Sequence, residues 1–386
     1  MIYLDNSATT EISAAAKKTM TAAMDVYGNP SSTHSLGIEA KGVLDRAREK
    51  VGAALGCGRV NAENLIFTAS GSEANNTAIL GSVYAKQNRR GNKIITTDSE
   101  HPSVENVMKK LEADGFEVVR IRTKGGVLDF EQLEGALDGG VLLVSLMMVN
   151  NETGAAYDVK RAFAMARRIS PNSVLHCDAI QGFLKIPFTP KSIGADLVSI
   201  SAHKIHGPKG VGALYISPDI IKMRKITPYI LGGGQEGGLR SGTENVVGIA
   251  GFGAAAEQGK REFAQSVAKM TELRELCESG AITAGARVNI PQGNRAPHVL
   301  SVTLPDIKSE TMLNFLSGKG ICISAGSACS AHSKNMSPTL LNFGLTSHEA
   351  DCTVRISFSE CNTESDVQVL AAALTEGINT LVRIRR

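Results

Sequence analysis

The sequence contains no tryptophan, and aromatic residues make up only 4% of its 386 residues. It also lacks any continuous apolar run of about 18 residues, the length that would indicate a membrane-spanning helix. The N-terminus, MIYLDNSATTEISAAAKK, carries an early acid and has no apolar stretch typical of a signal peptide. The formal net charge is only +3, too small an excess to indicate nucleic acid or membrane lipid as a partner. We therefore expect a cytoplasmic protein with neither partner.

The cysteines also lack a pattern. There are seven, an odd number, scattered along the chain without a CxxC pair. Zinc sites and disulfide frameworks both need regular cysteine spacing, so we expect reduced thiols and no metal site.

Apolar strand-like segments alternate with helical patterns from residue 64 to about residue 216. This alternation predicts an α/β fold with a mostly parallel sheet and helices on both faces. After about residue 255 a long Ala-, Glu- and Lys-rich helical pattern leads into short strands, which predicts a smaller α+β domain. We expect a segment 1–13 that packs with the small domain, a large domain over 14–257, and a small domain over 258–386.

A lysine stands at the end of one predicted core strand. Lys204 follows the run LVSIS at 197–201, and Asp178 ends the strand-like run before it. Burying an unpaired charge costs several kcal/mol, so both residues require partners. An aldehyde cofactor held covalently by a lysine, with an acid on its pyridine nitrogen, uses these two groups. The alternatives are a lysine whose charged end reaches water and an aspartate that caps a turn.

Other polar residues stand where strands lead into turns. Gly71 and Ser72 precede a predicted helix, where backbone N–H groups can cradle an anion, or where Ser72 simply caps the helix. Ser201 and His203 flank the same turn as Lys204 and would join Ser72 around a phosphate. His101 occupies another strand-to-helix junction and either stacks on a planar ring or serves as a capping or core histidine.

Three further residues are candidates in the second half of the chain. Arg355 lies within the apolar run TVRISFS, where it would bind a substrate carboxylate or form an internal salt bridge. The glycine-rich stretch 232–245 predicts a loop, and Thr243 near its end is a candidate ligand of a phosphate or a partner. Cys329 stands in the small-residue run 323–333, which indicates either a nucleophile carried on a loop or an incidental thiol.

Taken together, ten short motifs in this order resemble the NifS/IscS-like cysteine desulfurases of the class V aminotransferase family. They span nearly the whole chain: YLDNSATT, NPSSTHSLG, SGSEANN, EHPSVEN, NNETG, CDAIQ, SAHKIHGPKG, RSGTEN, GSACS and VRISF. The resemblance implies a fold-type I, aspartate aminotransferase-like enzyme with a seven-stranded sheet. It also implies pyridoxal 5'-phosphate as cofactor and a homodimer.

The resemblance assigns roles to residues around that cofactor. Lys204 looks like the lysine that holds it, Asp178 corresponds to the acid on its ring nitrogen, and Gln181 to the ligand of its ring hydroxyl. His101 is similar to the imidazole that stacks on the ring.

Four residues match the family's phosphate ligands. Ser72, Ser201 and His203 would come from the same chain, and Thr243 from the other subunit of a dimer.

The remaining matches concern the substrate. Asn151 and Arg355 resemble the groups that orient the carboxylate of L-cysteine, and Cys329 falls on the catalytic cysteine. The implied reaction yields L-alanine and a persulfide on Cys329, delivered to an acceptor protein, a scaffold or a thiolation enzyme, for iron–sulfur cluster assembly or tRNA thiolation. Selenocysteine lyase or another small-amino-acid aminotransferase remains an alternative, as does a catalytically idle assembly scaffold.

Overall fold

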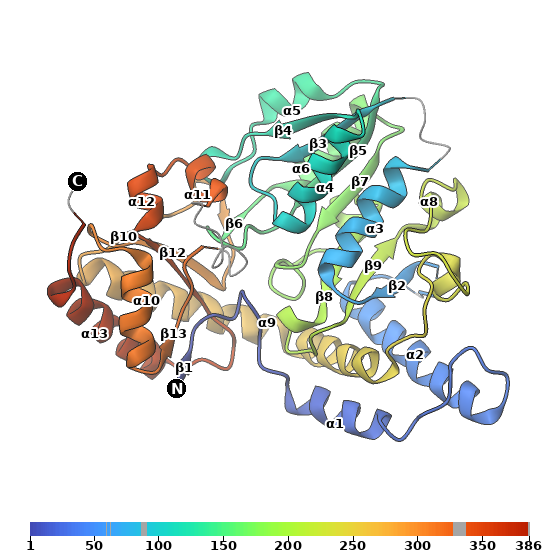
Figure 1. The fold of residues 1–386 in the computed structure, drawn as a ribbon, viewed down its shortest axis with the longest axis horizontal. Coiled ribbons are helices and arrows are strands. Elements are labelled where there is room, and N and C mark those ends of the chain that lie inside the picture. Colours follow the sequence, from blue (N-terminus) through green and yellow to red (C-terminus); the bar gives the residue numbers. More distant parts are fainter. Residues whose placement is uncertain (59, 62, 86–90, 327–336, 385–386) are drawn as a thin grey trace.

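The computed structural model describes residues 1–58, 60–61, 63–85, 91–326 and 337–384. A seven-stranded sheet forms the centre of its larger half (Figure 1). In spatial order its strands are β2 (Leu65–Thr68), β9 (Gly212–Ile216), β8 (Leu197–Ser201), β7 (Val174–Asp178), β5 (Val141–Met147), β3 (Lys93–Thr97) and β4 (Glu117–Ile121). β9 runs antiparallel to both neighbours, and the consecutive pairs from β8 to β4 are parallel. The expectation of a mostly parallel, seven-stranded sheet is therefore confirmed.

Helices cover both faces of this sheet, which is why a strand such as β5 is buried along its whole length. One face packs on α3 (Gly71–Val83) and α4 (Pro102–Ala113), and the other on α2 (Ser35–Ala54) and α6 (Val159–Ile169). The other elements of this half are α1 (Ala14–Ala23), α5 (Phe130–Ala136), β6 (Ala155–Ala156), α7 (Pro190–Ile193), α8 (Pro218–Lys222) and short 3-10 turns at Lys124–Gly126, Ala202–Lys204 and Glu236–Gly238.

The smaller half is built on an antiparallel three-stranded sheet, β10 (Arg287–Val288), β12 (Val299–Thr303) and β14 (Thr353–Ser357). Around it lie α10 (Ser309–Gly318), α11 (Pro338–Phe343), α12 (Ser347–Asp351) and α13 (Glu364–Thr380). A further short strand, β11 (Asn294–Arg295), pairs with β6 of the large half. None of the helices in the described ranges is both long and apolar enough to cross a membrane.

Helix α9 (Val246–Thr283) connects the two halves (Figure 1). Phe252 and Ala256 pack in the core of the large sheet, whereas Met270 and Leu273 pack in the core of the smaller half. The domain boundary expected at 257/258 falls inside this helix, and the division itself stays a prediction.

The N-terminal segment touches both halves. Its strand β1 (Ile2–Tyr3) pairs with β13 (Ile321–Cys322) in the smaller half. Further along, Thr10 Oγ1 donates to the carbonyl of His203 in the larger half. The segment therefore links the smaller half to the larger one.

Candidate active site

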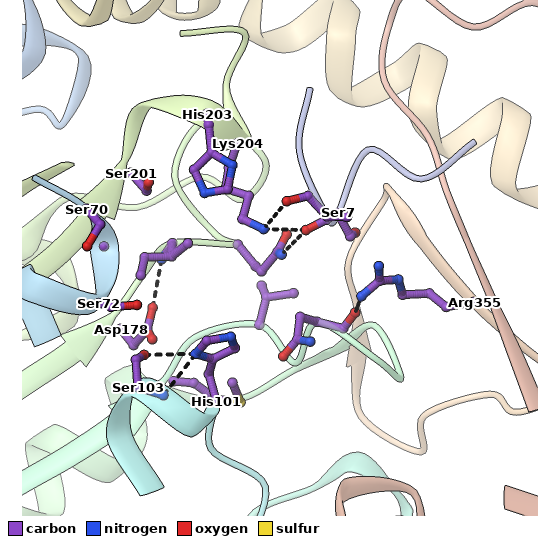
Figure 2. Close-up of a pocket in the computed structure, with 17 residues that line it drawn as sticks. Ser7, Ser70, Ser72, His101, Ser103, Asp178, Ser201, His203, Lys204 and Arg355 are labelled. Atoms are coloured by element: carbon purple, nitrogen blue, oxygen red, sulfur yellow. Dashed lines mark hydrogen bonds between the residues drawn. The ribbon is translucent and has the colours of Figure 1, made fainter. Parts of the chain in front are cut away.

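A cavity of about 220 Å³ opens between the two halves, beside the carboxyl ends of β7 and β8 (Figure 2). Ligands of open α/β sheets bind at such strand ends. Nine of the residues expected in the site line it: Ser72, His101, Asn151, Asp178, Gln181, Ser201, His203, Lys204 and Arg355. The chain thus brings residues from distant motifs to one place.

Lys204 lies on the 3-10 turn that follows β8, and its amine reaches across to the N-terminal segment. Nζ donates to the carbonyl oxygen of Ser7 and, at 2.8 Å, to that of Ala8. The Lys204 ammonium is thus hydrogen-bonded at the cavity wall rather than extended into water. These hydrogen bonds explain why a lysine is tolerated at the end of a core strand.

Asp178 ends β7 and is buried. Asn75 Nδ2 donates to its Oδ2 at 2.7 Å, and the backbone N–H of Ile180 donates to Oδ1 at 3.0 Å. Burial raises the pKa of Asp178, whereas these two bonds and the charge of Lys204 act in the opposite direction. A protonated ring nitrogen in the cavity would stabilise this carboxylate further.

His101 is the N-cap of α4 and also lines the cavity (Figure 2). Its capping role is therefore compatible with a role in the site. Its Nδ1 accepts from the backbone N–H of Ser103 at 3.1 Å. Burial, assisted by the charge of Lys204, lowers the pKa of His101 to about 4. The imidazole is therefore neutral, and because Nδ1 accepts, its proton is on Nε2.

The start of α3 forms an anion cradle. Ser70, not Ser72, is the N-cap of this helix, so the capping interpretation of Ser72 is wrong, and Ser72 lines the cavity in the first turn. Ser201 is 1% exposed, and its Oγ has no hydrogen-bond partner among the described residues. A Cβ on Gly71 would lie 2.4 Å from Ile180 Cδ1, so a larger residue would require the Ile180 side chain to shift. A phosphate here would satisfy the Ser201 hydroxyl and meet helix N–H groups.

His203 lies on the same side of the cavity, with Nδ1 at 3.2 Å from Thr9 Oγ1. Burial, together with the charges of Lys204 and Lys209, lowers its pKa to about 4. It is therefore a neutral hydrogen-bonding group at neutral pH.

Arg355, on β14, approaches the cavity from the smaller half. Its Nη1 donates to the carbonyl of Asn151 at 2.9 Å, and its Nη2 donates to Asp5 Oδ1 at 2.8 Å. The internal salt bridge that was one of two alternatives for Arg355 thus exists. Nε is buried and has no hydrogen-bond partner among the described residues, and the Arg355 side chain lines the cavity.

One expected site residue among those the structure describes does not line this cavity: Thr243, which is exposed. Cys329 lies outside the described residues.

Several residues in the site escaped the sequence interpretation. Ser7 and Asp5 belong to the motif YLDNSATT, which carried the resemblance but received no role. Asn75 belongs to SGSEANN and reaches Asp178 because one helical turn separates it from the N-terminus of α3. Both motifs carried the resemblance. The charged residues that Asp5, Ser7 and Asn75 contact in the site, however, lie more than 100 positions away in the sequence.

The chain is similar to a known protein family and to several known proteins. The family described as Aminotransferase class-V matches residues 2–370. A cysteine desulfurase from Trichormus azollae is 36% identical over 386 residues, covering 99% of this chain and 94% of that protein. A solved NifS-like protein is 36% identical with a TM-score of 0.90, covering 98% of this chain and all of its own. A structure described as SspA in complex with cysteine is 31% identical with a TM-score of 0.80, covering 94% and 100%.

The cavity carries a lysine at the strand ends of a mostly parallel sheet, and the class V aminotransferase family matches most of the chain. Together these findings define the class: a class V aminotransferase. The chain belongs to this pyridoxal phosphate-dependent family and, within it, to the NifS/IscS-like cysteine desulfurases.

Proposed function

We propose that this protein is a pyridoxal phosphate-dependent cysteine desulfurase that converts L-cysteine to L-alanine and receives the sulfur on Cys329 as a persulfide. The observation that carries the proposal is the convergence of Lys204, Asp178 and Arg355 on one cavity. An amine, a buried acid and a guanidinium are what a carboxylate-bearing amino acid and a pyridine cofactor require.

The cavity fits the cofactor chemically. The Ser201 hydroxyl has no hydrogen-bond partner within the described part of the chain, the α3 N-terminus suits an anion, and the buried Asp178 suits a ring N–H⁺. The residues that would hold the cofactor are Lys204 through Nζ, Asp178, Gln181, His101, Ser72, Ser201 and His203. When bound, pyridoxal phosphate supplies an electron sink for the pair of electrons left when a Cα proton is removed.

The chain's own groups carry the other tasks. Arg355 binds the substrate carboxylate, and Asn151 orients it. Lys204 Nζ, as the neutral amine, accepts the Cα proton and later returns a proton to Cα. The Cys329 thiolate attacks the substrate sulfur, forming an S–S bond while the C–S bond breaks. The electrons of that bond remain on the substrate carbon, which takes up a proton and leaves as alanine.

The test is alanine and sulfide release from L-cysteine in the presence of a thiol reductant, with wild type beside Cys329→Ala. Both proteins must first show the visible absorbance of bound cofactor. Equal amounts of alanine and sulfide from wild type, and neither from the variant, support persulfide formation. Wild type that binds cofactor but makes neither product contradicts the proposal, and assays with L-selenocysteine and amino-group acceptors then test the alternatives.

We further propose a homodimer in which Thr243 contributes to the neighbouring subunit's phosphate site. Its support is the exposed loop 231–245, anchored by an ion pair between Arg48 and Glu236 with Nη1–Oε2 of 2.7 Å. The large exposed side chains Tyr229 and Leu231 lie beside or within this loop.

Mixed dimers test this arrangement. Wild-type subunits paired with Lys204→Ala subunits retain one complete site. Wild-type subunits paired with the double variant Lys204→Ala/Thr243→Ala should bind cofactor more weakly at that site. Equal affinity in both mixtures, or a monomer in solution, contradicts the arrangement. The acceptor is proposed as a scaffold or thiolation protein, to be identified by transfer of ³⁵S from Cys329.

A further inference from the structure

A buried histidine stands directly behind the cavity, where the mechanism gives it no role. His298 immediately precedes β12 and is 1% exposed. Its Nε2 lies 3.1 Å from Gln181 Oε1, and its Nδ1 has no hydrogen-bond partner among the described residues. The imidazole therefore makes one hydrogen bond, and that bond goes to a residue that lines the cavity.

The Gln181 amide is held at both ends. Its oxygen faces His298, and its Nε2 donates to the carbonyl oxygen of Ser7 at 2.9 Å. That same carbonyl accepts from Lys204 Nζ. If the amide turned by 180°, its oxygen would face the Ser7 carbonyl and its NH₂ group would face His298 Nε2. The first contact would be repulsive, and the second would require the imidazole to carry its proton on Nδ1, which has no hydrogen-bond partner among the described residues. The two partners together therefore favour one orientation.

The surroundings of His298 also fix its protonation state. Burial, followed by the positive charges of Lys185, Arg355, Lys204 and Arg274, holds the pKa of His298 well below its usual range. The ring is thus neutral with a single proton. Because Gln181 presents an acceptor to Nε2 and no described group hydrogen-bonds to Nδ1, the proton belongs on Nε2.

We propose that His298 is a positioning residue, which fixes the Gln181 amide so that its N–H side, and not its oxygen, is available to the cofactor. The proposal rests on the proposed function, because Gln181 matters in this way only if it faces the ring hydroxyl of pyridoxal phosphate. His298 itself touches neither cofactor nor substrate and acts through Gln181.

The orientation has a spectroscopic consequence. An N–H donor stabilises negative charge on the cofactor's ring oxygen, and this charge is greatest when the bound chromophore is deprotonated. Loss of the donor, or its replacement by an amide oxygen, therefore raises the pKa of the chromophore. A charge-assisted hydrogen bond of ordinary strength corresponds to a shift of about one pH unit.

The experiment is a spectrophotometric pH titration of the visible absorbance band of the holoenzyme. His298→Leu removes the donor, whereas His298→Gln keeps an N–H at the position of Nε2. We expect the midpoint to rise by about one unit in His298→Leu and to stay close to wild type in His298→Gln. The same titration of Gln181→Leu and of the double variant Gln181→Leu/His298→Leu tests whether His298 acts through Gln181.

In the Gln181→Leu background, removing His298 should add no further shift. An unchanged midpoint in His298→Leu overturns the proposal, and so does a shift that persists undiminished without Gln181. If His298→Leu does not fold, as judged by thermal unfolding, His298→Met replaces it as the donor-free variant. Alanine formation by wild type is measured separately, so failure of the proposed function is distinguishable from failure of this inference.

Discussion

Arg355 and Asp5, 350 positions apart in the chain, form an ion pair with 2.8 Å between Nη2 and Oδ1. Arg355 is 2% exposed, and Asp5 balances its buried positive charge. With Nη1 bonded to the Asn151 carbonyl and Nη2 to Asp5, both ends of the guanidinium are fixed. Asp5 thus orients the group that we propose to bind the substrate carboxylate.

Asp5→Asn should therefore raise the KM for L-cysteine about tenfold, because a neutral amide holds the guanidinium less firmly than a carboxylate does. Arg355→Lys should raise KM further, since an ammonium lacks the planar fork. Steady-state kinetics of both variants provide the measurement. A KM that falls in Asp5→Asn would mean that Asp5 competes with the substrate for Arg355.

Glu100 gives a prediction for stability against pH. It is buried beneath the cavity, and burial raises its pKa to about 8 from an ordinary value of 4.5. A raised pKa means that the folded state retains a proton which the unfolded state loses above pH 4.5. The contribution of Glu100 to stability is thus complete below pH 4.5 and declines as the pH rises toward 8, by about 1.4 kcal/mol per pH unit.

Glu100→Gln removes this ionisation but keeps an oxygen for the bonds from Met147 N and Thr97 Oγ1. We expect the free energy of unfolding of the variant, relative to wild type, to increase by about 1 kcal/mol per pH unit between pH 5.5 and pH 7.5. Urea unfolding at both pH values measures it. A difference independent of pH would show that Glu100 is ionised in the folded protein.

The ion pair of Arg48 and Glu236 predicts a large stability effect. Both side chains are nearly fully buried, and Glu236 also accepts from the backbone N–H of Phe67 at 2.7 Å. Arg48→Met should cost about 3–5 kcal/mol, because it leaves an unpaired buried carboxylate. Arg48→Met/Glu236→Gln should recover at least half of that loss, since the amide carries no charge. If the double variant is as unstable as the single variant, the loss of stability comes from lost packing of Arg48 and not from the unpaired carboxylate.

His101 predicts the form of the pH–rate profile. With a pKa of about 4, it is neutral at every pH from 6 to 9 and contributes no inflection there. His101→Gln should lower kcat by about 10²-fold, and the profile of the remaining activity should keep the inflections of wild type. Disappearance of an inflection near pH 6.5 in the variant would assign that ionisation to His101.

The sequence predicted what depends on local patterns. Apolar runs predicted β5, β7 and β8, and Asp178 and Lys204 fall at strand ends because parallel strands end at one edge. Nine residues named from the motifs line the cavity, and their roles stay predictions. These features follow from short-range periodicity and from a whole-chain resemblance.

What the sequence did not predict depends on long-range pairing. Nothing near Asp5 indicates that it meets Arg355, and nothing near Gln181 indicates His298. Ser72 was a reasonable candidate for the cap of α3, but Ser70 has the extended backbone that a capping residue needs. The role of Thr243 stays a prediction, because it concerns a second chain, which one sequence does not specify.

The N-terminal segment has a consequence for biosynthesis. Ser7 and Ala8 leave the ribosome about 200 residues before Lys204, whose amine they bind. Ser7 is also fixed by Ser357 Oγ, which accepts from the Ser7 N–H at 2.9 Å. The large sheet can form while the chain is still being made, but the wall of the cavity closes only after β14 has emerged. A nascent or C-terminally truncated chain would hence contain Lys204 and Asp178 without a working catalytic centre, so synthesis to near the last helix precedes the first turnover.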